Sequence, residues 1–273
     1  MLRLAIRVAR EDAELVLAEL LELAPGGVEE ADHGEEVEYA VYGAPGELPE
    51  LPALEAAAGG ALVSISTTEV ADDWAERWRA FHQPIEVGGR LFVRPPWEEP
   101  REGLIDLLID PGQAFGTGAH PTTRLCLELL VGLGPDSVGP AIDVGCGSGV
   151  LAVAAAKLGH GPVLGLDHEV ESVRATIENA EVNGVAGAIE ARRFDLLRDG
   201  RIPSAPLVLA NLLRPLLLCV ARVGWDGEPP RTLIASGLLE HEASEIAPAF
   251  APHGLVEAER RVDQGWAALL LTR

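Results

Sequence analysis

From residue 101 onward, the chain alternates between short apolar runs and longer segments whose apolar positions recur three and four residues apart. The first pattern is typical of buried strands and the second of amphipathic helices. Their alternation predicts an α/β, Rossmann-like, doubly wound sheet that binds ligands at the carboxyl ends of its strands. A terminal pair of segments, 255–261 and 266–272, has no helix between them and predicts an antiparallel strand inserted at the end. The expected strands lie at 104–109, 140–143, 162–167, 188–193, 206–210, 232–236, 255–261 and 266–272, and the helices at 124–133, from 150, 169–183, from 215, and 240–250.

The first 70 residues show shorter segments, with apolar and polar positions alternating along several of them. Their order, strand–helix–strand–strand–helix–strand, predicts a small α+β domain of the ferredoxin-like type. The expected strands lie at 2–8, 28–32, 37–42 and 62–68, and the expected helices at 11–23 and 51–58.

A helix that begins near Asp72 follows, and it places Trp74, Trp78 and Phe81 on one face. Packing of these aromatic rings on a domain is the simpler interpretation, and a platform for a substrate is the alternative. A hairpin is predicted at 84–96. The expected organisation is an N-terminal substrate-recognition domain at 1–70, a linker helix and hairpin at 71–100, and a cofactor-binding catalytic domain at 101–273.

The strand predicted at 140–143 leads into three glycines at alternate positions, Gly145, Gly147 and Gly149, before an alanine-rich helix. Strand, glycine turn and helix N-terminus are the parts of a nucleotide-binding unit, because glycines let a ligand approach the backbone closely. The next strand ends at Asp167, where a carboxylate can accept hydrogen bonds from both hydroxyls of an adenosine ribose. The sequence therefore predicts a site for an adenosine-containing cofactor.

The spacing of the glycine turn argues against a dinucleotide. The dinucleotide fingerprint reads GxGxxG, whereas this turn reads GxGxG, with Val150 at the position of the third glycine. Asp143 precedes the turn, and an acid there suits the cationic end of a ligand better than a diphosphate. These features favour S-adenosylmethionine, which carries an ammonium and a sulfonium but no phosphate. With the strand order, they point to the seven-stranded class I methyltransferase sheet.

A second glycine-rich stretch reads Asp110-Pro-Gly-Gln-Ala-Phe-Gly-Thr-Gly-Ala-His-Pro-Thr-Thr123. A plain connector needs one or two turn residues, whereas this one contains four within nine positions. We therefore expect its backbone to approach a ligand. Thr122 and Thr123 are expected to cap the following helix and to offer their hydroxyls.

Composition and charge restrict the class of protein. No apolar run is long enough to span a membrane, and the N-terminus lacks the pattern of a signal peptide. Three widely separated cysteines predict reduced thiols, and seven histidines show no metal-ligand spacing. We expect a soluble, cytoplasmic monomer without a metal.

The net charge of −22 argues against direct contact with nucleic acid. Residues 1–70 contain three arginines and no lysine against fifteen acidic residues, a net charge of −12. This acidity suits a basic protein partner, and general solvation of the surface is the alternative.

Taken together, these motifs resemble the ribosomal protein L-eleven (L11) methyltransferase family, PrmA. The resemblance covers the catalytic half densely and the linker helix well, and it covers the first 70 residues in layout more than in motif. It rests on the stretch 110–123, on Ile142-Asp-Val-Gly-Cys-Gly-Ser-Gly-Val-Leu-Ala152, on Asn211-Leu-Leu, and on Asp72-Asp-Trp with Trp78.

The resemblance implies S-adenosylmethionine as the methyl donor. It implies lysine side chains and the N-terminal amine of L11, a basic ribosomal protein, as acceptors, either on the free protein or on the large subunit. The chain departs from the family at His168, where an apolar residue often separates two acids. The cofactor-binding residues expected from the family and from the motifs are Phe115, Gly116, Thr117, Thr123, Gly145, Gly147, Asp167, Asp195 and Asn211.

Two of these residues have further expected roles. Asn211 ends a strand, and its amide oxygen is expected to accept a hydrogen bond from the incoming amine and to align it for transfer. No general base is evident beside it. Asp195 is expected either to accept from the adenine amine or to cap the next turn.

Three other functions stay open at this point. A class I methyltransferase acting on another protein lysine or on a small molecule would share the same motifs. A nicotinamide-dependent oxidoreductase is disfavoured by the position of Val150. A binding module without activity would not need the second glycine-rich stretch.

Overall fold

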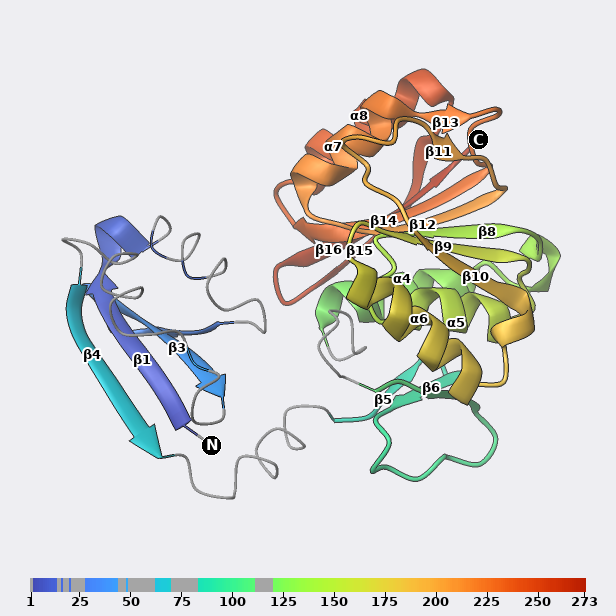
Figure 1. Cartoon of the computed structure of the whole chain (residues 1–273). Coiled ribbons are helices and arrows are strands. Elements are labelled where there is room, and N and C mark those ends of the chain that lie inside the picture. Colours follow the sequence, from blue (N-terminus) through green and yellow to red (C-terminus); the bar gives the residue numbers. More distant parts are fainter. Residues whose placement is uncertain are drawn as a thin grey trace. The chain divides into compact units, whose positions relative to one another are not determined.

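The computed structural model describes residues 2–13, 16, 20, 28–43, 48, 62–69, 83–110 and 120–273. The chain divides into two compact units, Met1–Phe81 and His82–Arg273, which are coloured by sequence in Figure 1. Among the described residues, no helix is long and apolar enough to cross a membrane. The same residues contain no group of His, Cys, Asp or Glu side chains arranged to hold a metal ion.

The described part of the first unit is an antiparallel sheet. Its strands are β1 (Leu2–Ala9), β2 (Glu29–Asp32), β3 (Glu36–Gly43) and β4 (Leu62–Glu69). They are ordered β2-β3-β1-β4, and they match the four strands predicted for residues 1–70. Alternation along β1 buries Leu4, Ile6 and Val8 in one core with Tyr39 of β3.

The opposite side of β1 carries charge. Arg3 and Arg7 donate to the two carboxylate oxygens of Glu38 in β3, at 2.6 and 2.7 Å. These hydrogen bonds hold the pKa of Glu38 below its usual range. Part of the acidity of this unit is therefore neutralised within the sheet.

Several predictions for the first unit fall outside the described residues. These include the helix at 51–58 and the aromatic helix of the linker. Of the helix at 11–23, a 3₁₀ turn at Arg10–Asp12 and the buried residues Ala13, Val16 and Leu20 are described. The ferredoxin-like character of the unit stays a prediction.

The second unit is built on one seven-stranded sheet. Its strands are β8 (Ala141–Val144), β9 (Val163–Asp167), β10 (Ile189–Arg193), β12 (Leu207–Asn211), β14 (Thr232–Leu239), β15 (Val256–Asp263) and β16 (Trp266–Thr272). They are ordered β10-β9-β8-β12-β14-β16-β15. The first five are parallel, and β16 lies antiparallel between β14 and β15. This confirms the predicted class I methyltransferase sheet with its inserted antiparallel strand.

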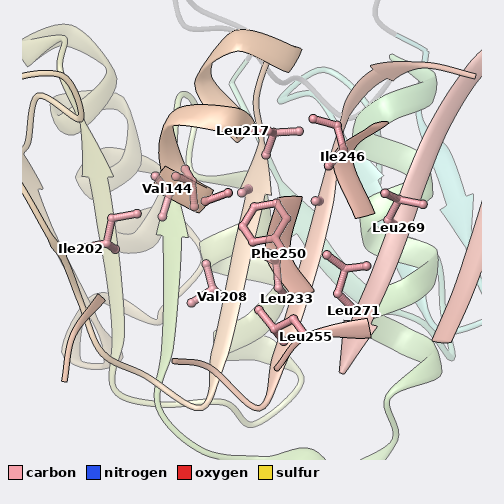
Figure 2. Packing of buried hydrophobic residues seen from close by; sticks show 14 of the residues in the cluster. Val144, Ile202, Val208, Leu217, Leu233, Ile246, Phe250, Leu255, Leu269 and Leu271 are labelled. Carbon is pink, nitrogen blue, oxygen red and sulfur yellow. The ribbon is translucent and has the colours of Figure 1, made fainter. Parts of the chain in front are cut away.

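Helices cover both faces of this sheet (Figure 1). On one side lie α4 (Pro121–Gly132), α5 (Val150–Lys157) and α6 (Val170–Val182), and on the other α7 (Arg214–Val223) and α8 (Ala243–Phe250). Figure 2 shows the second interface, where Leu217, Ile246 and Phe250 pack against Leu233 and Leu269 of the sheet. Each side chain buried in this way contributes roughly 1.5–3 kcal/mol to stability. This core holds the strands whose carboxyl ends carry the site.

A smaller sheet contains the predicted hairpin. Its strands are β5 (Ile85–Val87), β6 (Leu91–Arg94) and β7 (Ile105–Leu108), with β7 parallel to β6. Val87, Leu91 and Leu107 share a core with α4 and α5. The hairpin therefore belongs to the second unit, and its predicted place in the linker is wrong. The strand predicted at 104–109 is present as β7, but it joins this small sheet instead of the large one.

A few short elements are absent from the sequence predictions. Two-residue strands, β11 (Ile202–Pro203) and β13 (Trp225–Asp226), form a parallel pair. Further 3₁₀ turns lie at Pro135–Ser137, Ala186–Ala188 and Ala251–His253.

Candidate functional site

The glycine turn lies at the carboxyl end of β8, as predicted. The N–H groups of Gly145 and Cys146 both donate to the carbonyl of Leu166 in β9, at 2.7 and 3.1 Å. Gly145, Gly147 and Gly149 have φ values of 75°, 53° and 79°, in the left-handed region that side chains rarely enter. The turn thus has a fixed shape that depends on glycine and on the neighbouring strand.

Asp167 lies at the end of β9 and is 8% exposed. Its Oδ2 accepts from the N–H of Gly147 and its Oδ1 from the N–H of Glu169, each at 3.0 Å. The carboxylate therefore supports both the glycine turn and the start of α6. A carboxylate has about four acceptor positions, so these two bonds leave capacity for the hydroxyls of a ribose.

His168, where the chain departs from the family pattern, is mostly exposed. Its Nδ1 lies 3.4 Å from Oδ1 of Asp167. The substitution thus places an imidazole beside the carboxylate without removing either of the backbone hydrogen bonds of Asp167.

Asp143 is fully enclosed beneath the turn. Its Oδ2 accepts from the N–H of Ala152 at 3.1 Å, in the first turn of α5, where the N-cap Gly149 has no side chain to fill this role. Its Oδ1 is buried, and no described residue forms a hydrogen bond with it. Burial, with Asp167 nearby, raises the pKa of Asp143 to about 7.

Asn211 and Thr123 are brought together from distant parts of the sequence. Asn211 ends β12, and its Nδ2 donates to Oγ1 of Thr123 in α4 at 3.2 Å. Thr123 is buried. The Oδ1 of Asn211 is also buried and has no hydrogen-bond partner among the described residues, and an unsatisfied buried acceptor is rare enough to require an explanation. It is available to a donor that arrives with a ligand.

The prediction that Thr122 and Thr123 cap the following helix is wrong. The helix begins at Pro121, three residues earlier than expected, and its N-cap is His120. Nδ1 of His120 accepts from the N–H of Thr122 at 3.3 Å, and Pro121 suits the first helical position because it lacks an N–H. The ring of His120 also packs edge-on against Trp266, with 4.9 Å between ring centroids.

Asp195 follows β10, and its side chain supports a turn. Oδ1 accepts from the N–H of Leu197 at 2.9 Å, and Oδ2 lies 3.3 Å from Nε of Arg198. The main chain beside it is tied to β9, because the N–H of Phe194 donates to the carbonyl of Asp167 at 2.7 Å. The turn-capping alternative therefore describes the observed contacts, and a contact with adenine stays a prediction. Three further candidates, Phe115, Gly116 and Thr117, lie outside the described residues.

Sequence reasoning missed the contribution of α6 to the turn. Oγ1 of Thr176 donates to the carbonyl of Gly147 at 3.1 Å, and Nδ2 of Asn179 donates to the carbonyl of Ser148 at 2.9 Å. The signal was present: these polar residues are three apart in the predicted helix, on the face that turns inward. Only the fold shows that this face meets the glycine turn.

The described site residues form a row along the carboxyl edge of four adjacent strands. Asp195, Asp167, the glycine turn and Asn211 follow β10, β9, β8 and β12, which neighbour one another in that order. The row offers a carboxylate, a close backbone approach and an unpartnered amide oxygen. These groups fit a ligand that has vicinal hydroxyls at one end and a cationic end without phosphate.

Comparison with known proteins decides the family. A family model described as ribosomal protein L11 methyltransferase (PrmA) matches residues 8–273. The chain belongs to the PrmA family.

Similar proteins agree with this assignment. A ribosomal protein L11 methyltransferase of Pelotomaculum thermopropionicum is 41% identical, with 77% of this chain and 69% of that protein aligned. One of Burkholderia multivorans is 33% identical, with 99% and 97% aligned. The crystal structure of a ribosomal protein L11 methylase from Lactobacillus delbrueckii subsp. bulgaricus has a TM-score of 0.61 and 31% identity, covering 70% of this chain and 98% of that one.

The resemblance seen in the sequence is thereby confirmed. As a member of the PrmA family with a class I fold, the chain is an S-adenosylmethionine-dependent methyltransferase. The nicotinamide-dependent alternative is set aside.

Proposed function

We propose that this PrmA-family chain transfers methyl groups from S-adenosylmethionine to lysine side chains and to the N-terminal amine of ribosomal protein L11. The observation that carries the proposal is the buried Oδ1 of Asn211, for which the described part of the chain provides no hydrogen-bond donor. It lies at the end of β12, next to the strand that leads into the glycine turn. An acceptor in this position suits an amine that approaches a cofactor lying along the turn.

The residues present fit the cofactor. Asp167 would hold the ribose hydroxyls, and Gly145 and Gly147 would let the methionine portion lie against the backbone. Thr123 would support the site through its bond to Asn211. When bound, S-adenosylmethionine would supply an electrophilic methyl group for in-line displacement by a nucleophile, with neutral S-adenosylhomocysteine as the leaving group.

The chemical contribution of the chain is mainly alignment. Nδ2 of Asn211 is anchored on Thr123, so its amide plane is fixed and Oδ1 can accept one N–H of the amine. Positioning of this kind lowers the barrier to transfer, because the entropy cost of bringing the amine and the methyl donor together is met when they bind. The amine must be neutral to react, and free lysine has a pKa of about 10.4 and an α-amine about 8. We expect this proton to leave before transfer, and we assign no general base.

The first unit is proposed to bind the protein substrate. Its net charge of −12 over residues 1–70 would attract a basic ribosomal protein. Arg3 and Arg7 pair with Glu38, and Arg3 also lies 4.0 Å from Glu29, and the net charge of −12 already includes these arginines. We propose a cytoplasmic monomer that acts on free or subunit-bound L11 without direct contact with nucleic acid.

The test is methylation of purified L11 by the full chain with isotope-labelled S-adenosylmethionine, followed by mass spectrometry of the product. We expect label on lysine side chains and on the N-terminal amine. A second basic ribosomal protein serves as the control and should remain unlabelled. Transfer to that protein or to a small amine, with L11 unlabelled, would instead support a methyltransferase with a different substrate.

A further inference from the structure

The buried face of α6 is unusually polar. Ser172, Thr176 and Asn179 are each less than 5% exposed, and Ala180 is the apolar residue buried with them. Amides and hydroxyls are costly to bury unless they form hydrogen bonds. The partners of these side chains therefore indicate why this face is polar.

Asn183, at the C-cap of α6, binds the edge of β7. Its Oδ1 accepts from the N–H of Leu108 at 3.0 Å, and its Nδ2 donates to the carbonyl of the same residue at 2.6 Å. One side-chain amide thus pairs with both backbone groups of one residue, as a neighbouring strand would. This pairing satisfies an edge of the small sheet and does not touch the glycine turn.

Asn179 makes a different connection. Its Oδ1 accepts from the N–H of Asp110 at 3.2 Å, and its Nδ2 donates to the carbonyl of Ser148 at 2.9 Å. Asp110 opens the second glycine-rich stretch, and Ser148 lies inside the glycine turn. A single amide therefore joins the start of one motif to the interior of the other, although the two are far apart in the sequence.

The turn is held on more than one side. Thr176 donates to the carbonyl of Gly147, the residue before the one held by Asn179. The N–H of Gly147 donates to Asp167. Side chains thus hold three polar groups of the turn backbone, the N–H and carbonyl of Gly147 and the carbonyl of Ser148, and both carbonyls are held from α6.

We propose that Asn179 is a positioning residue for methyl transfer, which sets the shape of the glycine turn and fixes the start of the second glycine-rich stretch relative to it. This inference rests on the proposed use of the turn by S-adenosylmethionine. A substitution that removes the Nδ2 donor of Asn179 breaks its bond to the carbonyl of Ser148. We expect the turn then to relax and the affinity for S-adenosylmethionine to fall. A purely structural role would instead lower stability without a specific effect on the cofactor.

The test compares Asn179→Asp with Asn183→Asp in the full chain. Both changes keep an acceptor oxygen and remove a donor on the same helix, but only the first removes a bond to the glycine turn. We expect Asn179→Asp to weaken S-adenosylmethionine binding in calorimetry about 10-fold or more, and to raise its KM. The affinity of Asn183→Asp for the cofactor should stay within about twofold of the wild-type affinity, although its loss of Tm is comparable to that of Asn179→Asp.

Two variants with smaller structural changes provide the test if the aspartate variants do not fold. Thr176→Val removes the hydroxyl that contacts the carbonyl of Gly147 and Sγ of Cys146, both in the turn, and nearly preserves shape. Asn179→Ser shortens the bridge without adding charge. In both variants, the affinity for S-adenosylmethionine should fall further than the loss of Tm alone would explain. Equal affinity in the Asn179 and Asn183 variants, or affinity losses that simply follow Tm, would overturn the inference. A wild-type chain that fails to bind S-adenosylmethionine would instead overturn the proposed function itself.

Discussion

Asp167 and Gly147 are joined by a hydrogen bond of 3.0 Å from the backbone N–H of the glycine to Oδ2 of the carboxylate. The bond connects the end of β9 with the turn after β8. The residue expected to hold the ribose therefore also holds the backbone on which the rest of the cofactor would lie. Cofactor affinity and local stability are coupled at this position.

Two substitutions of Asp167 distinguish its effect on cofactor affinity from its effect on stability. Asp167→Asn keeps one acceptor oxygen, and we expect it to stay folded while S-adenosylmethionine binding weakens by about 1.5–3 kcal/mol, the range for a hydrogen bond to a charged group. Asp167→Ala removes both acceptors and should also lower Tm. Calorimetry and thermal unfolding of both variants provide the check. Unchanged affinity in Asp167→Asn would show that the carboxylate only supports the turn.

Asp143 predicts a pH dependence of stability. Its pKa is raised from 3.8 to about 7 by burial, so between these values the folded state binds more protons than the unfolded state. Stability from this group is therefore fully present below about pH 4 and is lost as the pH rises through about 7.

The matched variant is Asp143→Asn, which preserves shape and cannot ionise. Urea unfolding at pH 5 and pH 8 should show a smaller decrease in the free energy of unfolding for this variant than for the wild type. An equal decrease in both proteins would contradict the raised pKa of Asp143.

Gly145 has too little space for a side chain. A Cβ there would lie 2.4 Å from Cδ2 of Leu212, the residue after Asn211, and φ is 75°. Gly145→Ala should therefore displace Leu212 and weaken cofactor binding as well as stability. The control is Gly200→Ala, where φ is 89° but nothing lies within 4 Å of the new Cβ. It should cost about 1–2 kcal/mol from backbone strain alone, with cofactor affinity retained in calorimetry.

Docking of a basic substrate on an acidic unit predicts a salt effect. Attraction between exposed charges is screened within about 8 Å at physiological ionic strength. The KM for L11 should therefore rise steeply with added salt, while S-adenosylmethionine affinity changes little. Steady-state kinetics over a salt series provides the measurement, and a KM for L11 that stays flat would indicate that the acidity serves solubility.

Much of this fold was predictable from local patterns. Five strands of the large sheet, β8, β9, β12, β14 and β16, are largely apolar runs, whereas the edge strands β10 and β15 are mostly polar. Asp167 was predictable as a site residue because it ends one of the apolar strands. The contacts of Asn179 were not predictable, because they join residues 31 and 69 positions away. The N-cap of α4 was misplaced because the ring nitrogen of His120 takes the role expected of a threonine hydroxyl.

We propose that Oδ1 of Asn211, which is unpaired within the described ranges, aligns the amine at the point of methyl transfer. The most direct test is the single-turnover rate of L11 methylation at saturating S-adenosylmethionine and L11. We expect Asn211→Ala to slow this step by about 100-fold or more, the scale of misalignment at a reacting centre. Thr123→Val, which keeps the oxygen but removes its anchor, should slow it less. A wild-type rate in Asn211→Ala would show that this oxygen does not align the amine.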